Sequence, residues 1–315
     1  MTVKTIKRYS SLFIYILLIG FAANAQNYDP SYFSFEEDSL TVLFDSIKNS
    51  DNDIVKSELN EIIVDVVEEM LYDDNSFNYP FDSLKQIGII KSHDELLRIY
   101  TWNILLSDNT YKYFGFIQYF NKKHKEYSVY QLIDKSAEIE EPERLTLTHD
   151  RWYGALYYSV IETKDSRHKY YTLLGWDGNN ELTSKKIVET LYFTQSGKPR
   201  FGANIFHVIT GEGRRARKHR QKRIIFEFSS KVSMALHYES KMKMIVFDHL
   251  SPSESHLKNK YQYYGPDWSY DALKFEKGKW QYLSDIDPRN PKPKIEKPKW
   301  KYSKSEDFYR SKSAN

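Results

Sequence analysis

Acid, imidazole and hydroxyl side chains that could carry out catalysis occur together at one place in this 315-residue chain. Residues 247–252 (FDHLSP) bring Asp248, His249 and Ser251 into one short segment. A nucleophilic triad is assembled in space from separated positions, and no G-x-S-x-G turn accompanies these residues. Carboxylates are plentiful, but no spacing singles out an acid and base pair. The segment therefore predicts a strand end entering a turn, and no catalytic residue is assigned.

Metal ligands are the next class of candidate. Residues 175–181 (GWDGNNE) place Asp177 and Asn179 at the alternating spacing of a calcium loop, but Leu182 stands where such a loop needs a glycine. The nine histidines form no HExxH motif, and the chain has no cysteine. The sequence thus predicts a hairpin turn at residues 175–181, and neither a metal site nor a cofactor.

A dense basic segment could bind a polyanion. Residues 211–223 (GEGRRARKHRQKR) contain seven Lys or Arg residues between two expected strands. Clustered arginines pair with phosphate or carboxylate groups, so a polyanion site would be formed by Arg214, Arg215, Arg217, Lys218 and Arg220. The alternative is a long, solvated hairpin loop. Because the segment lacks interleaved aromatic residues that stack on bases, nucleic acid is not predicted as a partner.

Aromatic residues are the most unusual feature of the composition, with 26 Tyr, 18 Phe and 6 Trp. Most of them are expected to fill the core and the cross-strand pairs of β-sheets. Others lie beside turn-forming Gly, Pro and Asp residues, where they could form an exposed platform for a sugar ring or a peptide. These candidate ligand-binding residues are Trp176, Tyr263, Tyr264, Trp268 and Tyr270.

The N-terminus has the pattern of a secretory signal peptide. Lys4, Lys7 and Arg8 precede an apolar run over residues 12–23, which is shorter than the about 20 apolar residues that span a bilayer. The small-x-small site Ala-Asn-Ala ends this region. Residues 1–25 are therefore predicted to be cleaved on export to the periplasm or the cell exterior, with an uncleaved anchor as the alternative. Because cysteine is absent, we expect no lipid anchor, and because cleavage removes the apolar run, we expect a soluble protein with no stable membrane insertion.

Charge is distributed unevenly once the signal peptide is removed. The whole chain carries 46 basic and 43 acidic side chains, and the three basic residues of the signal account for the whole excess. Residues 27–75 contain fourteen acidic and two basic side chains, whereas residues 289–315 contain nine basic and three acidic ones. The two ends are therefore expected to attract each other or to present separate faces.

The hydrophobic pattern predicts a mainly β fold with an N-terminal α-helical segment. In an acidic segment at residues 26–80, apolar residues recur at helical spacing and indicate two amphipathic helices. Residues 81–287 change to short β-branched and aromatic runs separated by turn-forming residues. These runs indicate an antiparallel meander forming a sandwich or a barrel-like sheet. No repeat of about 20 to 50 residues is found, which disfavours a propeller.

Two segments interrupt this β domain. Residues 183–190 begin with a capping Thr and are predicted to form a short helix. Residues 134–150 form a long acidic connection that marks either a subdivision of the domain or a flap. The strands are expected at residues 97–104, 111–120, 127–133, 152–163, 169–176, 191–194, 200–209, 223–229, 232–238, 243–248, 270–276 and 280–283.

Residues 288–315 form a Lys/Pro-rich tail. Proline at this spacing favours an extended, solvated chain. The alternative is an ordered strap docked on the acidic helices, because Trp300, Tyr302, Phe308 and Tyr309 are costly to expose to water.

Five motifs are spread along the chain after residue 25. They are RIYTWNI (98–104), LLGWDGNN (173–180), FGANIF (201–206), IVFDHLSP (245–252) and SYDALKFEKGKW (269–280). In these motifs the chain resembles a group of uncharacterised exported proteins of Gram-negative bacteria. The resemblance implies export, and it carries no activity and no catalytic residue.

Two functions from different classes are consistent with the sequence. The first is a non-enzymatic periplasmic or surface protein that binds a glycan, a peptide or an envelope partner through its aromatic strands. The second is an envelope hydrolase with an unrecognised active site, suggested by the abundant carboxylates and His249. A pocket in which titratable side chains converge would favour the second.

Overall fold

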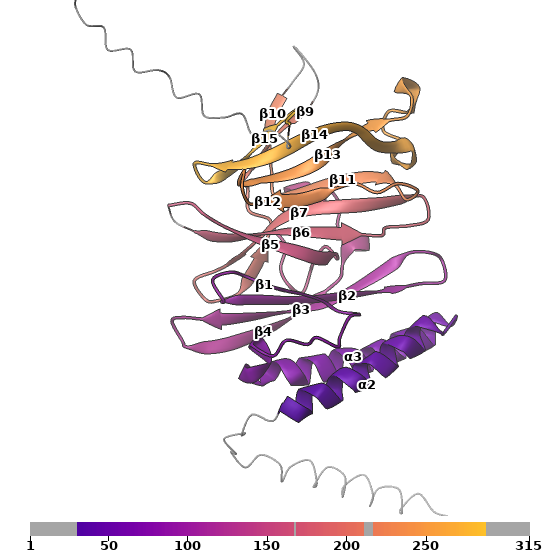
Figure 1. The fold of residues 1–315 in the computed structure, drawn as a ribbon, viewed down its shortest axis with the longest axis vertical. Helices are drawn as coiled ribbons and strands as arrows, with labels where there is room; N and C mark the ends of the chain where they lie inside the picture. The colour runs from indigo at the N-terminus through magenta and orange to yellow at the C-terminus, as the bar shows by residue number, and fades with distance from the viewer. Residues whose placement is uncertain (1–29, 167, 211–216, 288–315) are drawn as a thin grey trace, which may run out of the picture.

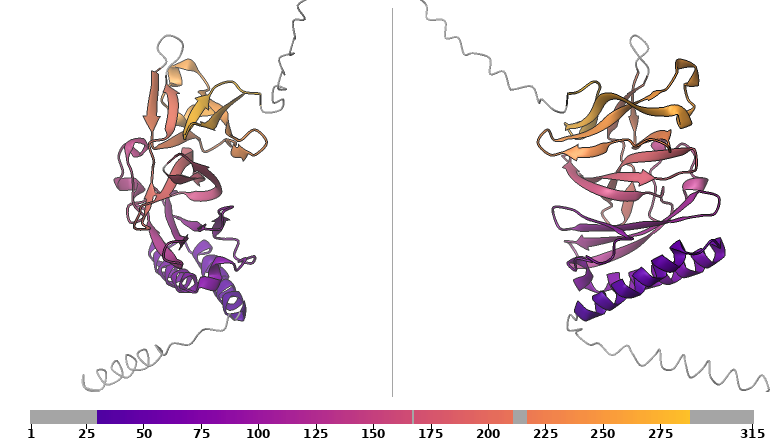
Figure 2. Two further views of the ribbon diagram at one scale, coloured as in Figure 1. Left: turned by 90° about the vertical axis from the view of Figure 1, so that its left-hand side faces the viewer. Right: turned by 45° about the vertical axis from the view of Figure 1, so that its right-hand side comes forward.

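The computed structural model describes residues 30–166, 168–210 and 217–287 (Figure 1). Helices lie at one end of an elongated stack of strands, and the chain passes from that end to the other as the sequence proceeds (Figures 1 and 2). The predicted signal peptide and the Lys/Pro-rich tail lie outside the described residues. Within the described ranges, no helix is long and apolar enough to cross a membrane.

The two N-terminal helices are confirmed: α2 spans Pro30–Lys48 and α3 spans Asp53–Tyr72. Asn52 caps α3, because its side-chain oxygen accepts hydrogen bonds from the backbone N–H groups of Ile54 (2.9 Å) and Val55 (3.4 Å). The apolar faces of the helices pack against each other and against the first sheet. We call this helix pair the hairpin.

The first sheet is antiparallel and has the order β1-β2-β3-β4. Its strands are β1 (Gly88–Lys91), β2 (Leu97–Leu105), β3 (Tyr111–Asn121) and β4 (Glu126–Ile133). Buried Trp102 ties the sheet to α3, because its indole N–H donates to the side-chain oxygen of Asn60 at 2.8 Å. A short 3-10 turn, η1 (Asp74–Phe77), leads from the hairpin towards this sheet.

The second sheet has the order β11-β7-β6-β5, and a short strand β8 also pairs with β7. Its strands are β5 (Leu156–Lys164), β6 (Lys169–Asp177), β7 (Thr183–Phe193), β8 (Pro199–Phe201) and β11 (Arg223–Ser229). Successive side chains of β6 point to opposite faces of the sheet. Leu173 packs in a core shared with the first sheet, and Leu174 packs in a core shared with the third. The second sheet is therefore the middle layer of the molecule.

The helix predicted at residues 183–190 is wrong, because this segment belongs to β7. The strand pairs with β6 along one edge and with β11 along the other. Its β-branched side chains Ile187, Val188 and Thr190 are buried on both faces, a position that suits a strand better than a helix. The local capping signal of Thr183 was outweighed by this two-sided pairing.

The third sheet has the order β10-β9-β15-β14-β13-β12, and only β15 and β9 pair in parallel. Its strands are β9 (Phe206–Thr210), β10 (Arg217–Gln221), β12 (Leu236–Glu239), β13 (Met244–Pro252), β14 (Tyr264–Glu276) and β15 (Lys279–Leu283). The strand predicted at residues 200–209 is thus divided between β8 and β9. The prediction of a mainly β fold with N-terminal helices is confirmed, and the described strands form stacked open sheets rather than a closed barrel.

The connection at residues 134–150 contains two 3-10 turns, η2 (Ser136–Glu138) and η3 (Pro142–Arg144). It is tied to both neighbouring sheets, because the backbone N–H of Ile133 donates to His149 (2.8 Å) and that of Leu147 donates to β8 (2.8 Å). The connection lies between these sheets as a hydrogen-bonded segment.

Strands β13 and β14 extend beyond their neighbours. Strand β12 pairs only with residues 244–247 of β13, and β15 pairs only with residues 272–276 of β14. Residues 248–270 therefore form a two-stranded extension, closed by the turns η5 (Ser255–Leu257) and η6 (Tyr261–Tyr263). We call this extension the arm; it projects from the end of the molecule opposite the hairpin (Figure 1).

Candidate ligand-binding site

A β-bulge interrupts the arm at His249. Asp248 pairs with Tyr270, whereas Leu250 pairs with Pro266, so that one residue of β13 lies opposite three residues of β14. A bulge of this kind bends the strand and redirects the extra side chains. Trp268, the middle of the three residues opposite His249, is consequently turned out of the sheet.

Trp268 is both strained and exposed. Its φ angle is 71°, in the left-handed region that costs a residue with a side chain about 1–2 kcal/mol. Its side chain is 92% exposed, the largest value among the exposed large hydrophobic residues of the described ranges. Neither feature helps folding, because the strain raises the energy of the native state and the exposed indole gains no burial. Such a combination is a sign of function.

An ionised carboxylate, that of Asp267, belongs to the residue before Trp268. The carboxylate of Asp267 accepts hydrogen bonds from the backbone N–H (3.2 Å) and the hydroxyl (2.7 Å) of Ser269. Partial burial opposes ionisation of Asp267, but the Ser269 hydrogen bonds and the charge of His249 outweigh it and hold the pKa of this carboxyl below its usual value. The residue before Trp268 therefore carries a negatively charged acceptor at neutral pH.

The imidazole of His249 is held in place by a buried carboxylate, that of Asp271. Its Nδ1 lies 2.7 Å from Oδ2 of Asp271, and its Nε2 lies 4.0 Å from Oδ2 of Asp267. Asp271 is buried, and it also accepts from the Tyr282 hydroxyl and from the backbone N–H of Asp285 (3.0 Å). Burial and the bond to Asp271 raise the pKa of Tyr282 above its usual value, so its hydroxyl stays protonated and donates. The imidazole is thereby fixed in orientation while half of it remains accessible.

A hollow of about 350 Å³ lies farther along the arm. Half-exposed Tyr263 and Tyr264 provide its aromatic wall, and hydroxyl and amide groups provide the rest. Its lining residues are Ser229, Val232, Ser251, Ser253, Gln262, Tyr263, Tyr264, Gly265 and Pro266. Because Ser251 and Gly265 are cross-strand partners only one pair beyond the bulge, the hollow and Trp268 lie on the same short ribbon.

Four of the five predicted aromatic ligand-binding residues lie in the arm. Tyr263 and Tyr264 line the hollow, Trp268 stands at the bulge, and Tyr270 closes the bulge opposite Asp248. The structure does not bring the fifth, Trp176, to this place. Trp176 lies in β6, where its ring meets that of Tyr111 edge-on at 5.6 Å.

The basic segment is divided by the structure. Arg214 and Arg215 lie outside the described residues, whereas Arg217, Lys218 and Arg220 lie in β10 at the edge of the third sheet. The prediction of a solvated loop is therefore wrong for residues 217–221, which pair with β9 along five positions. Runs of basic residues suit an edge strand, because they oppose pairing with another chain.

The adjacent Asp248 and Ser251 do not complete a triad with His249. The carboxylate of Asp248 accepts from the backbone N–H of Ala235 at 2.7 Å, and Ser251 lines the hollow. The acid that does meet His249 is Asp271, which the sequence analysis missed. An acid inside an otherwise apolar strand run, as in YDALKF, is the signal that would have pointed to it.

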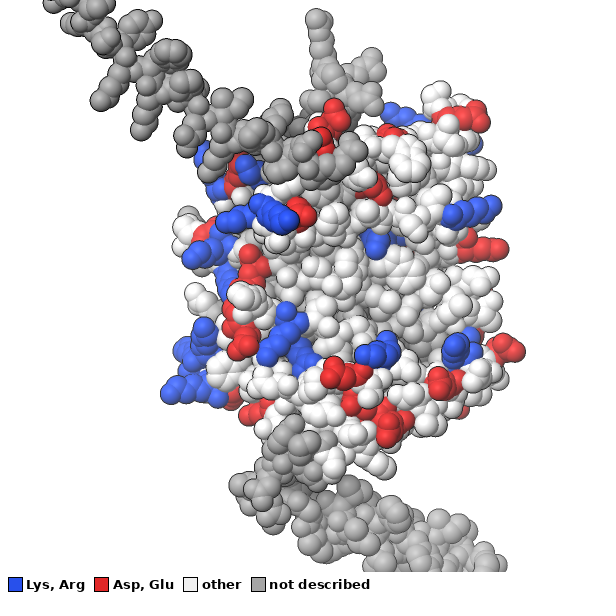
Figure 3. All heavy atoms as spheres, viewed as in Figure 1, with Lys and Arg blue, Asp and Glu red and all other residues white. Residues whose placement is uncertain are grey.

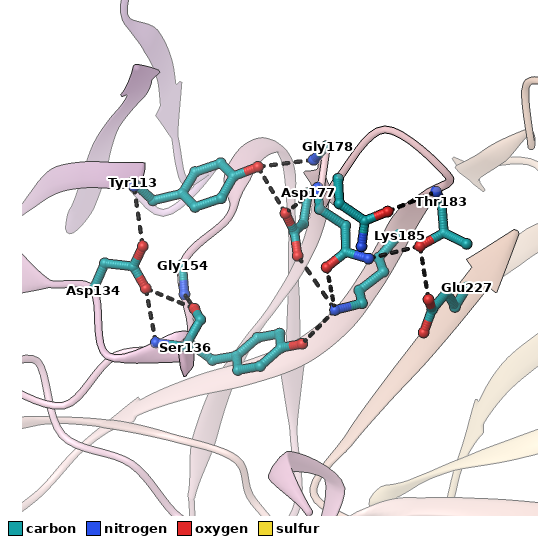
Figure 4. Close-up of polar contacts among 12 residues, drawn as sticks. Tyr113, Asp134, Ser136, Gly154, Asp177, Gly178, Thr183, Lys185 and Glu227 are labelled. Atoms are coloured by element: carbon teal, nitrogen blue, oxygen red, sulfur yellow. Dashed lines mark hydrogen bonds and ion pairs between the residues drawn. The ribbon is translucent and has the colours of Figure 1, made fainter. Parts of the chain in front are cut away.

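A second polar cluster, between the first and second sheets, is closed (Figure 4). The Tyr113 hydroxyl donates to Asp177 (2.8 Å) and accepts from the backbone N–H of Gly178 (2.8 Å). Lys185 donates to the side chain of Asn179 at 2.8 Å and lies 3.8 Å from the Asp177 carboxylate. Burial raises the pKa of Asp177, although Lys185 and these hydrogen bonds oppose the rise. The cluster is satisfied by the chain itself.

The β-hairpin turn predicted at residues 175–181, which is distinct from the helix pair, is confirmed, because these residues join strand β6 to strand β7. Asp177 turns inward to Tyr113, and Asn179 binds Thr183 through its side-chain amide at 2.6 Å. Across residues 30–166, 168–210 and 217–287, no group of three His, Asp or Glu side chains is placed to hold a metal ion.

Comparison with known proteins gave no match to a family model, to a curated protein or to a solved structure. The resemblance to exported proteins of Gram-negative bacteria therefore stays a prediction.

Proposed function

We propose that this chain is an exported, non-enzymatic binding protein whose arm binds a glycan. The observation that carries the proposal is Trp268, a large aromatic side chain held out of the sheet by a bulge, at a strained φ angle and with 92% of its surface exposed. A residue that costs stability and stays in water is best explained by a ligand that covers it.

The surroundings of the indole favour a sugar as that ligand. A sugar ring presents an apolar face of C–H groups and a rim of hydroxyls. Trp268 offers the apolar plane, and the carboxylate of Asp267 keeps acceptor capacity beyond its bonds to Ser269. The hollow adds the side chains of Gln262 and Tyr263, so that a short oligosaccharide could extend along the ribbon.

Export is supported by the signal-peptide pattern of residues 1–25, which would bring the arm into contact with envelope glycans. N-terminal sequencing of the secreted protein tests this part, with Gln26 as the expected first residue. Recovery of the chain with Lys4 still attached would contradict it.

The glycan proposal is tested by titrating the mature full-length chain with a panel of envelope oligosaccharides and peptides in a calorimeter. We expect binding to at least one oligosaccharide, and a loss of at least about tenfold in affinity for Trp268→Ala. The matched control is Tyr72→Ala, an exposed aromatic residue on α3 at the other end of the molecule, which should bind as the wild type does. A response to peptides alone, or equal losses in both variants, would contradict the proposal.

A hydrolase is the second candidate, favoured by the contact of 2.7 Å between His249 Nδ1 and Asp271. A buried acid that fixes an imidazole is the arrangement of a general base, which here would deprotonate a water molecule. Release of product from the same oligosaccharides, with a loss of about 10²–10⁴-fold in His249→Gln, would establish it. His256→Gln, an exposed histidine of the arm, is the control. Absence of product with the wild type would remove the hydrolase and leave the binding protein.

A further inference from the structure

The hairpin exposes apolar side chains that no described part of the molecule covers. On α2, Phe35 and Val42 are 67% and 65% exposed, and because they are seven residues apart they lie on one face of the helix. Of the large hydrophobic side chains exposed in the described part of the chain, six lie on the two helices: Phe35, Val42, Ile54, Val55, Ile62 and Tyr72. Single exposed apolar residues are ordinary, but a group on one helix pair marks an interaction surface.

The same face is strongly acidic. Asp38 and Asp45 follow Phe35 and Val42 by three residues each, so apolar and acidic side chains alternate along the exposed side of α2. The two helices together carry ten acidic and two basic side chains. Acidic side chains gather along the end of the molecule formed by the helices (Figure 3).

Acidic side chains of the two helices also repel one another. Burial and the neighbouring charge of Glu69 raise the pKa of Glu36, and burial together with Glu69, Glu36 and Asp73 raises the pKa of Tyr32 to about 12. A cationic partner placed over the hairpin would relieve this repulsion. The surface therefore calls for a segment that supplies both positive charge and apolar side chains.

One segment of the chain has this composition. Residues 288–315 carry nine basic and three acidic side chains, together with Trp300, Tyr302, Phe308 and Tyr309. Its lysines and arginines complement the acids of the hairpin, and its aromatic residues complement the exposed apolar side chains.

The described chain ends far from the hairpin. It leaves the third sheet at Asp287, just after the backbone N–H of Ile286 donates to Tyr270 (2.8 Å), whereas the hairpin covers the first sheet (Figures 1 and 2). Three layer spacings of about 10 Å separate the two, and the route leads around the outside of the molecule. Twelve residues lie between Asp287 and Trp300, and they span about 40 Å when extended, so Trp300 could reach the hairpin of its own molecule only with this segment almost fully extended.

We propose that the hairpin of one molecule binds residues 288–315 of a second copy of the chain. Because the two contact surfaces differ and the described chain ends far from the hairpin, each molecule would offer one of them to the next. Such a head-to-tail contact need not close, so it would build chains of molecules rather than a single dimer.

Sedimentation velocity of the mature full-length chain tests the proposal. We expect concentration-dependent assembly at low ionic strength, which weakens when salt screens the charges. The double variant Phe35→Ser/Val42→Ser and the tail variant Trp300→Ser should each weaken the association at least about tenfold. The matched control is Leu182→Ser, an exposed apolar residue in the β6–β7 turn, which should assemble as the wild type does. Circular dichroism shows whether each variant is folded.

Mixing the two variants separates contact between copies from contact within one. The hairpin variant keeps an intact tail and the tail variant keeps an intact hairpin, so a one-to-one dimer that grows no further is expected. A full-length chain that stays monomeric at every concentration, or a mixture that forms no dimer, would overturn the proposal. Trp268→Ala should assemble normally, so failure here is distinct from failure of glycan binding by the arm.

Discussion

Two buried carboxylates each contact a basic side chain, one between β7 and β11 and one beside the arm. The two contacts differ in how far the basic side chain is exposed to solvent. In the interior, Glu189 accepts from the guanidinium of Arg223 at 2.9 Å, and both side chains are completely buried. In the arm, Asp271 is buried but its partner His249 remains 43% exposed. A carboxylate therefore joins two neighbouring strands of the second sheet in one place, and holds a partly exposed imidazole in the other.

The partners of each acid explain the difference. Glu189 also accepts from the hydroxyl of buried Tyr157, and Arg223 donates to the carbonyl oxygens of Pro142 and Leu145. The interior pair is thus enclosed by three segments of the chain. In the arm, β13 and β14 pair only with each other around His249, and the side chain of His249 stays 43% exposed. Local stability is greatest where sheets stack, and binding surfaces remain where a ribbon leaves the stack.

Breaking the interior pair should have the largest effect. We expect Glu189→Gln to lower the free energy of unfolding by about 3–5 kcal/mol, because Arg223 would keep its charge in the core without a counter-ion. Urea denaturation measures the loss. Glu138→Gln, which removes an exposed pair with Lys135, should cost less than about 1 kcal/mol. Equal losses in the two variants would mean that the buried pair is no more important than a surface pair.

Removing one hydroxyl from the closed cluster should have a smaller effect. Tyr113→Phe removes one of the donors to the buried carboxylate of Asp177, which keeps the backbone N–H of Asn179 (2.7 Å), and it leaves the backbone N–H of Gly178 without its acceptor. We expect a loss of about 1–3 kcal/mol in urea denaturation. The control is Tyr72→Phe, whose exposed hydroxyl bonds to Glu68, and it should change stability by less than about 0.5 kcal/mol.

The arm should respond to mutation in the opposite direction. Trp268→Gly relieves the left-handed φ angle, so we expect the free energy of unfolding to rise by up to about 1 kcal/mol while glycan affinity is lost. Trp268→Ala keeps the strain and should lie within about 0.5 kcal/mol of the wild type. A glycine variant less stable than the alanine variant would contradict the strain at this φ angle, and an alanine variant much less stable than the wild type would show that the indole supports the fold.

The two regions should also differ in the sign of their pH dependence. The pKa of Asp177 is raised in the folded protein, so its contribution to stability falls as pH rises from its unfolded value through the raised one. The pKa of Asp267 is lowered, so its contribution is lost as pH falls below its unfolded value through the lowered one. The stability difference between wild type and Asp177→Asn should therefore shrink with rising pH, and that for Asp267→Asn should grow. Denaturation between about pH 3 and pH 6 measures both, and slopes of the same sign would contradict the assignment.

Much of the fold could be predicted from local patterns. The helical spacing of apolar residues identified α2 and α3, and aromatic and β-branched runs identified most strands. Residues 183–190 are one exception, because Thr183 resembles a helix cap, and residues 217–221, interpreted as a loop, are another. Residues 183–190 form a strand because they pair with β6 and β11, and the sequence alone does not reveal these partners.

The site was predictable only in part, for the same reason. Trp268, Tyr263 and Tyr264 were identified because they lie beside turn-forming residues. Asp271 was missed because its meeting with His249 depends on the register of β13 and β14 and on the bulge between them. A register shift of one residue would turn Asp271 to the other face, so contacts of this type need the structure.

Trp268 offers the most direct test of the account. Limited oxidation by N-bromosuccinimide, followed by peptide mass spectrometry, reports the accessibility of each tryptophan in the mature full-length chain. We expect Trp268 to be oxidised before Trp102, Trp152 and Trp280, which are buried, and to be protected when the oligosaccharide found in the titration is bound. Oxidation of Trp268 at an unchanged rate under saturating oligosaccharide would contradict the claim that the arm is the binding site.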